Sequence, residues 1–257
     1  MAEAEPAQAP ESLVPAPRIP LRRRSIYLLP NLLTTAALFA GFYAIVQAMN
    51  ARFEQAAVAI FVAMVLDGLD GRVARMTRTQ SEFGADYDSL SDMVSFGAAP
   101  ALVMYVWALK DLGTTGWIPA FVYCAAAAVR LARFNTNIEV VDKRFFQGLP
   151  SPAAAALVAG FIWVADDFGI LRVDWIRYIA FGLTLFAGVT MVVSIPFYSF
   201  KDFNLRKRVP IWAVPIFIGA ISVVAVNPPM VLFLMFVAYS LSGYFVWVFG
   251  KFRRKRN

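Results

Sequence analysis

Long apolar stretches, separated by short polar segments, follow one another through this chain from about residue 26 onward. Most of them approach the roughly 20 residues that an α-helix needs to cross the hydrocarbon core of a bilayer. The pattern therefore predicts an all-α, polytopic membrane helix bundle with about eight transmembrane helices. The predicted spans are residues 26–49, 53–75, 85–109, 117–134, 152–165, 175–197, 211–226 and 230–249.

The composition supports a membrane protein. The 257 residues are 60% hydrophobic, 15% aromatic and only 16% charged, which is too apolar for a soluble domain of this length. The single cysteine, Cys124, cannot form an internal disulfide, and the chain has no histidine. Proton transfer in any reaction must therefore use a carboxylate, lysine, tyrosine or water.

The basic residues gather on one side of the predicted membrane. Eight spans place both termini on the same side, and 20 of the 24 Lys and Arg residues fall there. The excess predicts a multi-pass protein of the cell (inner) membrane with cytoplasmic termini, and it explains the net charge of +7 without a nucleic-acid partner. We expect a disordered Ala/Pro/Glu-rich tail at 1–17, a transmembrane domain at 18–250 and a basic cytoplasmic tail at 251–257.

Four carboxylates, Asp67, Asp70, Asp88 and Asp92, flank the loop between the second and third predicted helices. At about 100° per residue, Asp67 and Asp70 share one helix face, and Asp88 and Asp92 lie one turn apart on the next helix. The short polar loop at 77–82 would direct all four toward one point near the cytoplasmic face. Carboxylates this close repel one another unless cations neutralise them, and oxygen ligands favour hard ions. The sequence therefore predicts two divalent cations, Mg²⁺ or Mn²⁺.

Small and basic residues accompany the carboxylates of the second helix. Gly71 and Ala74 would let a nucleotide approach the helix backbone, although close helix–helix contact is an alternative role for them. Arg75 offers a guanidinium fork for a phosphate group. The combination suits phosphoryl-group transfer on a lipid substrate.

The stretch 65–98 contains the pattern D-x2-D-G-x2-A-R-x8-G-x3-D-x3-D, which begins at Asp67 and ends at Asp92. This pattern resembles the signature of the CDP-alcohol phosphotransferases, and every fixed position is met. The resemblance implies the helical membrane fold of that family, a homodimer, and a site that binds the CDP part of a CDP-activated lipid or alcohol.

The resemblance also implies roles for individual residues. In the family, the residues that correspond to Asp67, Asp70, Asp88 and Asp92 hold two metal ions. Those that correspond to Asp67 and Asp88 are shared between the two ions. The family residue that corresponds to Asp92 also accepts the proton of the attacking hydroxyl. The implied contacts to CDP-diacylglycerol come from Pro30, Asn31, Gly71, Ala74, Arg75, Ser81 and Gly84.

Three further stretches, 88–100, 130–135 and 146–152, resemble the membrane-integral phosphatidylserine synthases of this family. The resemblance implies transfer of the phosphatidyl group from CDP-diacylglycerol to the hydroxyl of L-serine, with release of CMP. A guanidinium at the end of the fourth span could bind the serine carboxylate, but a topology anchor explains Arg130 equally well. The candidate serine contacts are Arg130, Arg133, Asn135 and Gln147.

Two other functions stay open from the sequence. A sister enzyme would use glycerol 3-phosphate, inositol phosphate or choline as the acceptor, and Lys143 with Arg144 could hold a second phosphate. An ion transporter is the alternative from another class, because intramembrane carboxylates often mark ion pathways. The position of the aspartates at one membrane face argues against a transporter.

Overall fold

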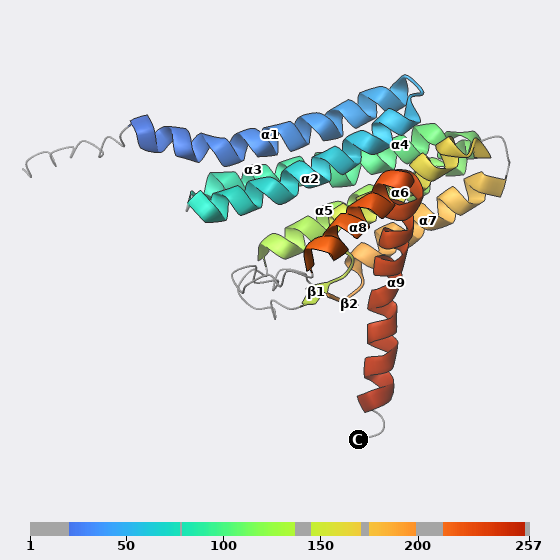
Figure 1. Cartoon of the computed structure of the whole chain (residues 1–257). Helices are drawn as coiled ribbons and strands as arrows, with labels where there is room; N and C mark the ends of the chain where they lie inside the picture. The colour runs from blue at the N-terminus through green and yellow to red at the C-terminus, as the bar shows by residue number, and fades with distance from the viewer. Residues whose placement is uncertain (1–20, 78, 137–144, 171–174, 199–212, 255–257) are drawn as a thin grey trace, which may run out of the picture.

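The computed structural model describes residues 21–77, 79–136, 145–170, 175–198 and 213–254. These ranges form a helical bundle with one pair of short strands, which confirms the predicted fold class (Figure 1). The predicted tail at 1–17 and the Lys143–Arg144 pair lie outside the described residues. The α-helices are α1 (Leu21–Met49), α2 (Phe53–Thr77), α3 (Glu82–Asp92), α4 (Ala99–Trp107), α5 (Trp117–Thr136), α6 (Ser151–Asp167), α7 (Trp175–Val192), α8 (Ala213–Val226) and α9 (Pro228–Arg254).

Within the described ranges, five helical segments are long and apolar enough to cross a membrane, so the chain is a multi-pass membrane protein. Helices α6 and α8 have only 17 and 14 residues, and α2 carries charged residues in its last turns. The count of eight crossings therefore stays a prediction. The five segments are Leu29–Met49, Glu82–Trp107, Trp117–Thr136, Trp175–Val192 and Pro228–Phe249.

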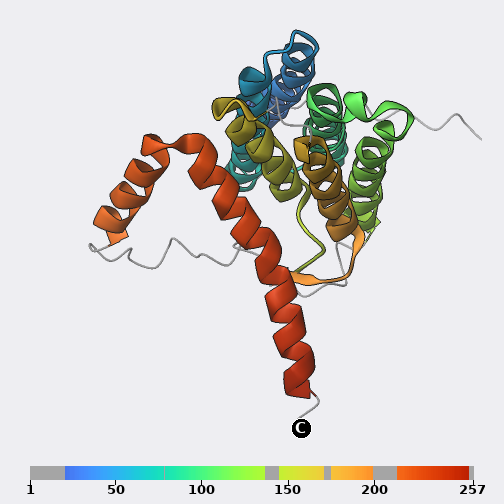
Figure 2. The same cartoon turned by 90° about the vertical axis from the view of Figure 1, so that its right-hand side faces the viewer.

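Helices α1 and α2 form an antiparallel hairpin that packs beside α3 and α4 (Figure 1). Their connection is a tight turn at Asn50–Arg52, in which Ala51 has a φ of 56°. Helix α9 runs across the bundle in both views, and its C-terminal end extends beyond the other helices (Figure 2). It continues to Arg254, inside the stretch that we assigned to a basic tail.

Helix α6 is the centre of the bundle. It begins with Pro152 in its first turn, where a missing amide hydrogen costs no helical hydrogen bond. Every residue from Ala153 to Ala159 is buried, because α2, α4, α7 and α9 surround the helix. The alanine-rich sequence allows this close packing, since small side chains let helix backbones approach one another.

Several predicted boundaries were wrong. The sixth span was expected to reach residue 197, but α7 ends at Val192 because Pro196 lacks an amide hydrogen and disfavours a helical conformation before it. The chain instead forms strand β2 (Pro196–Tyr198), which pairs antiparallel with β1 (Phe145–Gln147). The sequence did not indicate this small sheet.

The third span differs from the prediction at both ends. The helical run begins at Glu82, three residues before the expected start, and includes a π-helical segment, η1 (Met93–Ala98). It ends at Trp107, and a 3₁₀ segment, η2 (Leu109–Thr115), leads toward α5. The first helix also begins earlier than predicted, at Leu21 instead of residue 26, so Pro30 lies inside it.

Candidate active site

The turn from α2 to α3 brings the two acidic helix faces together. Helix α3 starts at an N-cap, where Ser81 Oγ accepts a hydrogen bond of 3.0 Å from the amide of Gly84. Such a cap satisfies one of the free amide groups at a helix start and defines the first residue of the helix. The resulting short connection folds α3 back against α1 (Figure 1).

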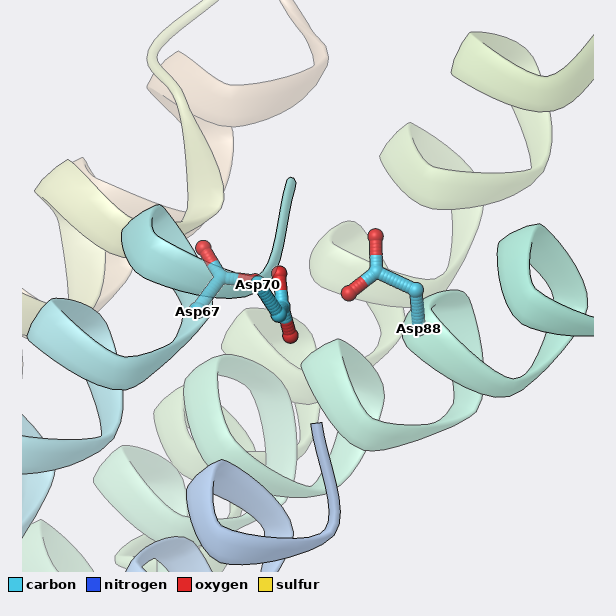
Figure 3. A group of neighbouring side chains, drawn as sticks. All are labelled: Asp67, Asp70 and Asp88. Carbon is cyan, nitrogen blue, oxygen red and sulfur yellow. The ribbon is translucent and has the colours of Figure 1, made fainter. Parts of the chain in front are cut away.

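Asp67, Asp70 and Asp88 form a compact group. Each offers a carboxylate oxygen, and these oxygens all lie within 4.8 Å of one another. Asp67 and Asp70 project from α2, and Asp88 approaches them from α3 (Figure 3). Asp70 is buried, and the other two are half-buried. The structure therefore brings together three of the four predicted carboxylates.

Asp92, the fourth predicted carboxylate, is not part of this compact group but lies beside it. Its carboxyl is within hydrogen-bonding reach of Asp67, and the guanidinium of Arg130 is close enough to attract it. Asp92 is half-buried at the end of α3, directly before the π-helical segment. It thus connects the carboxylate group with the basic end of α5.

The donor set of this site fits a divalent cation. Oδ1 of Asp88 is buried and, among the described residues, has no hydrogen-bond donor. A buried acceptor without a partner is unfavourable, and so are carboxylates at contact distance. A hard cation coordinated by oxygen would remove both penalties.

Thr34 of α1 is part of the site, although the sequence reasoning did not include it. Its hydroxyl lies 2.8 Å from Oδ2 of Asp70 and donates a hydrogen bond to that carboxylate. Ser91 of α3 donates to the backbone carbonyl of Thr34 at 3.2 Å, so one residue links α1 to both acidic helices. Thr34 follows Pro30 and Asn31 by about one helical turn, and this spacing could have identified it.

A pocket of about 190 Å³ opens beside the carboxylates. It lies among α1, α2 and the start of α3, and six of the seven residues predicted to contact CDP-diacylglycerol line it. Arg75, the seventh, is exposed and is not among the lining residues. The lining residues are Pro30, Asn31, Thr34, Asp70, Gly71, Ala74, Thr79, Gln80, Ser81, Gly84, Ala85 and Asp88.

Two of the candidate serine contacts, Arg133 and Gln147, bind each other. The Arg133 guanidinium donates to Oε1 of Gln147 at 2.5 Å and to Oγ of Ser194 at 3.3 Å. Gln147 lies in β1, and Ser194 lies between α7 and β2. The small sheet therefore holds this arginine at the end of α5.

The other two candidates, Arg130 and Asn135, lie near the aspartates of α3. Arg130 donates to the buried hydroxyl of Ser151 at 2.8 Å, and its Nε is buried without a partner among the described residues. Asn135 donates through Nδ2 to Oγ of Ser89, the residue after Asp88, at 3.0 Å. Arg130 and Asn135 are thus the two candidates that the structure places beside α3, with Arg130 near Asp92 and Asn135 at Ser89.

Comparison with known proteins agrees with this architecture. The family described as CDP-alcohol phosphatidyltransferase matches residues 27–198, which include all four aspartates and the small sheet. A protein of Helicobacter pylori (strain J99) named CDP-diacylglycerol–serine O-phosphatidyltransferase is 34% identical over 227 residues, covering 87% of this chain and 92% of its own.

Relatives with the same printed name occur in distant organisms. One from Mycobacterium bovis is 36% identical over 193 residues, covering 69% of this chain and 67% of its own. One from Saccharomyces cerevisiae is 36% identical over 160 residues, covering 54% of this chain and 57% of its own. The match spans more than half of the chain and includes the helices that carry the carboxylates. The chain therefore belongs to the CDP-alcohol phosphatidyltransferase family.

Proposed function

We propose that this protein is a phosphatidylserine synthase, which transfers the phosphatidyl group of CDP-diacylglycerol to L-serine. The serine hydroxyl oxygen attacks the lipid-side phosphorus, the bond from that phosphorus to the CMP oxygen breaks, and CMP leaves. The observation that carries this proposal is the carboxylate group of Asp67, Asp70 and Asp88, with Asp70 and Asp88 lining the adjacent pocket. The printed name shared by relatives that match most of the chain supports serine as the acceptor.

The pocket would bind the CDP part of the lipid substrate. Gly71 and Ala74 have little or no side chain, so a nucleotide can approach the α2 backbone between them. Asn31 of α1 and Ser81 before α3 offer polar groups on the other walls. We retain Arg75 as a phosphate contact, because an exposed guanidinium at the end of α2 can turn toward a bound pyrophosphate.

Asp67, Asp70, Asp88 and Asp92 would hold two divalent cations, Mg²⁺ or Mn²⁺. When bound, these ions would neutralise the charge that develops on the pyrophosphate. Thr34 keeps the Asp70 carboxylate in place through its hydrogen bond. Asp92 is the proposed base that takes the proton of the serine hydroxyl, since the chain has no histidine for that role.

We propose that L-serine binds on the α5 side of Asp92. Arg130 and Arg133 are the two cationic groups there that could bind the serine carboxylate, and Asn135 and Gln147 are polar groups beside them. A sister enzyme that uses an acceptor with its own phosphate is not favoured, because the relatives carry the name of the serine enzyme.

We place this site at the cytoplasmic face of the inner membrane, in the transmembrane domain at 18–250. The basic residues that the sequence concentrates on one side support that orientation. The family resemblance supports a homodimer.

The purified protein is expected to release CMP from CDP-diacylglycerol only when both L-serine and a divalent cation are present. Chelation with EDTA should stop CMP release, and excess Mg²⁺ or Mn²⁺ should restore it, because the carboxylate group needs cations to bind a pyrophosphate. Glycerol 3-phosphate, inositol phosphate and choline serve as matched alternative acceptors. CMP release with one of these and not with serine would contradict the proposed acceptor.

Arg133→Lys is expected to raise the KM for serine by about tenfold or more while changing the KM for CDP-diacylglycerol less than about threefold. Lysine keeps the positive charge but loses the planar fork that binds a carboxylate with two hydrogen bonds. Arg72→Lys is the matched control, since Arg72 is an exposed arginine on α2 that does not line the pocket. Equal changes in both KM values would assign Arg133 to the lipid phosphate or to membrane topology.

A further inference from the structure

The π-helical segment η1 (Met93–Ala98) begins at the residue after Asp92. At its end, the amide of Ala99 donates to the carbonyl of Val94, five residues earlier, in place of the four-residue spacing of an α-helix. A π segment adds one residue to a helix, and such segments occur frequently at functional sites. One added residue rotates the following part of the helix by about 100° relative to the preceding part. The segment therefore determines how the face with Asp88 and Asp92 is oriented relative to the buried face of α4.

A hydrogen bond from α5 holds this segment on one side. The hydroxyl of Tyr123 donates to the backbone carbonyl of Phe96 at 3.0 Å, and both side chains have 0% exposure. Because Tyr123 is fully buried, its hydroxyl cannot exchange this partner for bulk water. The hydrogen-bond spacing of a π segment differs from that of an α-helix, so the Phe96 carbonyl would take a different position in a regular α-helix.

Helix α1 holds the segment on the other side. Oγ of Ser95 donates to the backbone carbonyl of Ala37 at 3.1 Å. The two backbones approach closely here, since a Cβ built on Gly41 would lie only 2.6 Å from Cα of Ser95. The π segment is thus fixed between α1 and α5, and Asp92 is fixed with it.

We propose that Tyr123 is a positioning residue for Asp92. Its hydrogen bond stabilises the π segment, and the π segment keeps the Asp92 carboxyl beside Asp67. Without the hydroxyl, the segment can relax toward the α-helical spacing, and this relaxation turns the end of α3 relative to α2. The inference uses the metal site of the proposed function, but it does not depend on which alcohol is the acceptor.

Tyr123→Phe tests this inference because it removes only the hydroxyl. Mn²⁺ binding to the purified protein without substrate, measured by electron paramagnetic resonance of the free ion, is expected to weaken about three- to tenfold, the equivalent of one hydrogen bond. The kcat should fall by a similar factor while the KM for CDP-diacylglycerol changes less than about twofold. The melting temperature is measured alongside to confirm that the variant is folded.

Tyr244→Phe is the matched control. It removes a hydroxyl that bonds Thr190 at 2.7 Å between α9 and α7; neither residue belongs to the carboxylate group or lines the pocket, so Mn²⁺ binding should stay at the wild-type level. Unchanged Mn²⁺ binding in Tyr123→Phe, or an equal loss in Tyr244→Phe, would overturn the proposal.

Ser95→Ala provides a second test if Tyr123→Phe does not accumulate. Removal of the α1-side hydrogen bond should also weaken Mn²⁺ binding, and wild-type binding in this variant would overturn the role of the π segment. A wild-type protein that binds Mn²⁺ but does not transfer to serine would contradict only the proposed function, so the two failures are distinguishable.

Discussion

Asp67→Asn and Asp88→Asn are each expected to lower CMP release by about 10³-fold or more, with the protein still inserted in the membrane. Each change removes one negative charge from a group whose oxygens lie within 4.8 Å of one another. Asparagine is nearly the same size as aspartate, so the packing of α2 and α3 against α1 should persist. The loss therefore reflects weaker cation binding at the pyrophosphate.

The measurement is CMP release from purified protein at saturating Mg²⁺ and Mn²⁺, with the melting temperature in detergent as a folding control. Asp86→Asn is the matched control variant, because Asp86 lies on α3 beside the group but is exposed and outside it. This control should keep near-normal activity. Near-normal CMP release from Asp67→Asn or Asp88→Asn would rule out the two-metal assignment.

Asp92→Asn is expected to separate substrate binding from transfer. Binding of CDP-diacylglycerol should stay within about tenfold of the wild type, a difference of about 1.4 kcal/mol. Transfer to serine should fall by the larger factor of roughly 10²–10⁴ that a general base contributes. The structure favours this separation, since Asp92 lies outside the group of three carboxylates and outside the residues that line the pocket.

The two quantities are measured on the same preparation at saturating metal, with liponucleotide binding determined in the absence of serine. Asp70→Asn is the comparison variant, because Asp70 lines the pocket and belongs to the group of three. We expect its binding and turnover to fall together. If Asp92→Asn behaves in the same way, Asp92 is chiefly a metal ligand and the base is another residue.

Local spacing was sufficient to predict which carboxylates share a helix face. Asp67 and Asp70 are three residues apart on α2, and the helical repeat of 3.6 residues places them on one side regardless of the rest of the fold. The polar loop before Ser81 likewise indicated a break between α2 and α3, and the structure has an N-cap there. Apolar stretches of membrane-spanning length indicated the helical fold for the same local reason.

The meeting of the two acidic faces depends on tertiary contacts. Asp88 reaches Asp67 and Asp70 because α3 packs against α1, which also packs against α2, and Asp92 is directed toward Asp67 and Arg130. Spacing along one helix contains no information about the rotation of that helix relative to its neighbour. For this reason spacing alone could not show that three of the four carboxylates form the compact group, with Asp92 beside Asp67 at its edge.

The partners of several site residues also come from distant parts of the chain. Arg133 binds Gln147 and Ser194, which the small sheet brings together, and Thr34 binds Asp70 across 36 positions of sequence. The π segment after Asp92 is held by Tyr123 of another helix. Helix periodicity and residue spacing, which are local, therefore determined the elements and the motif of this protein. Packing between helices decided the orientation of Asp92. The sequence could not predict it, because hydrogen bonds between distant residues leave no periodic pattern in the sequence.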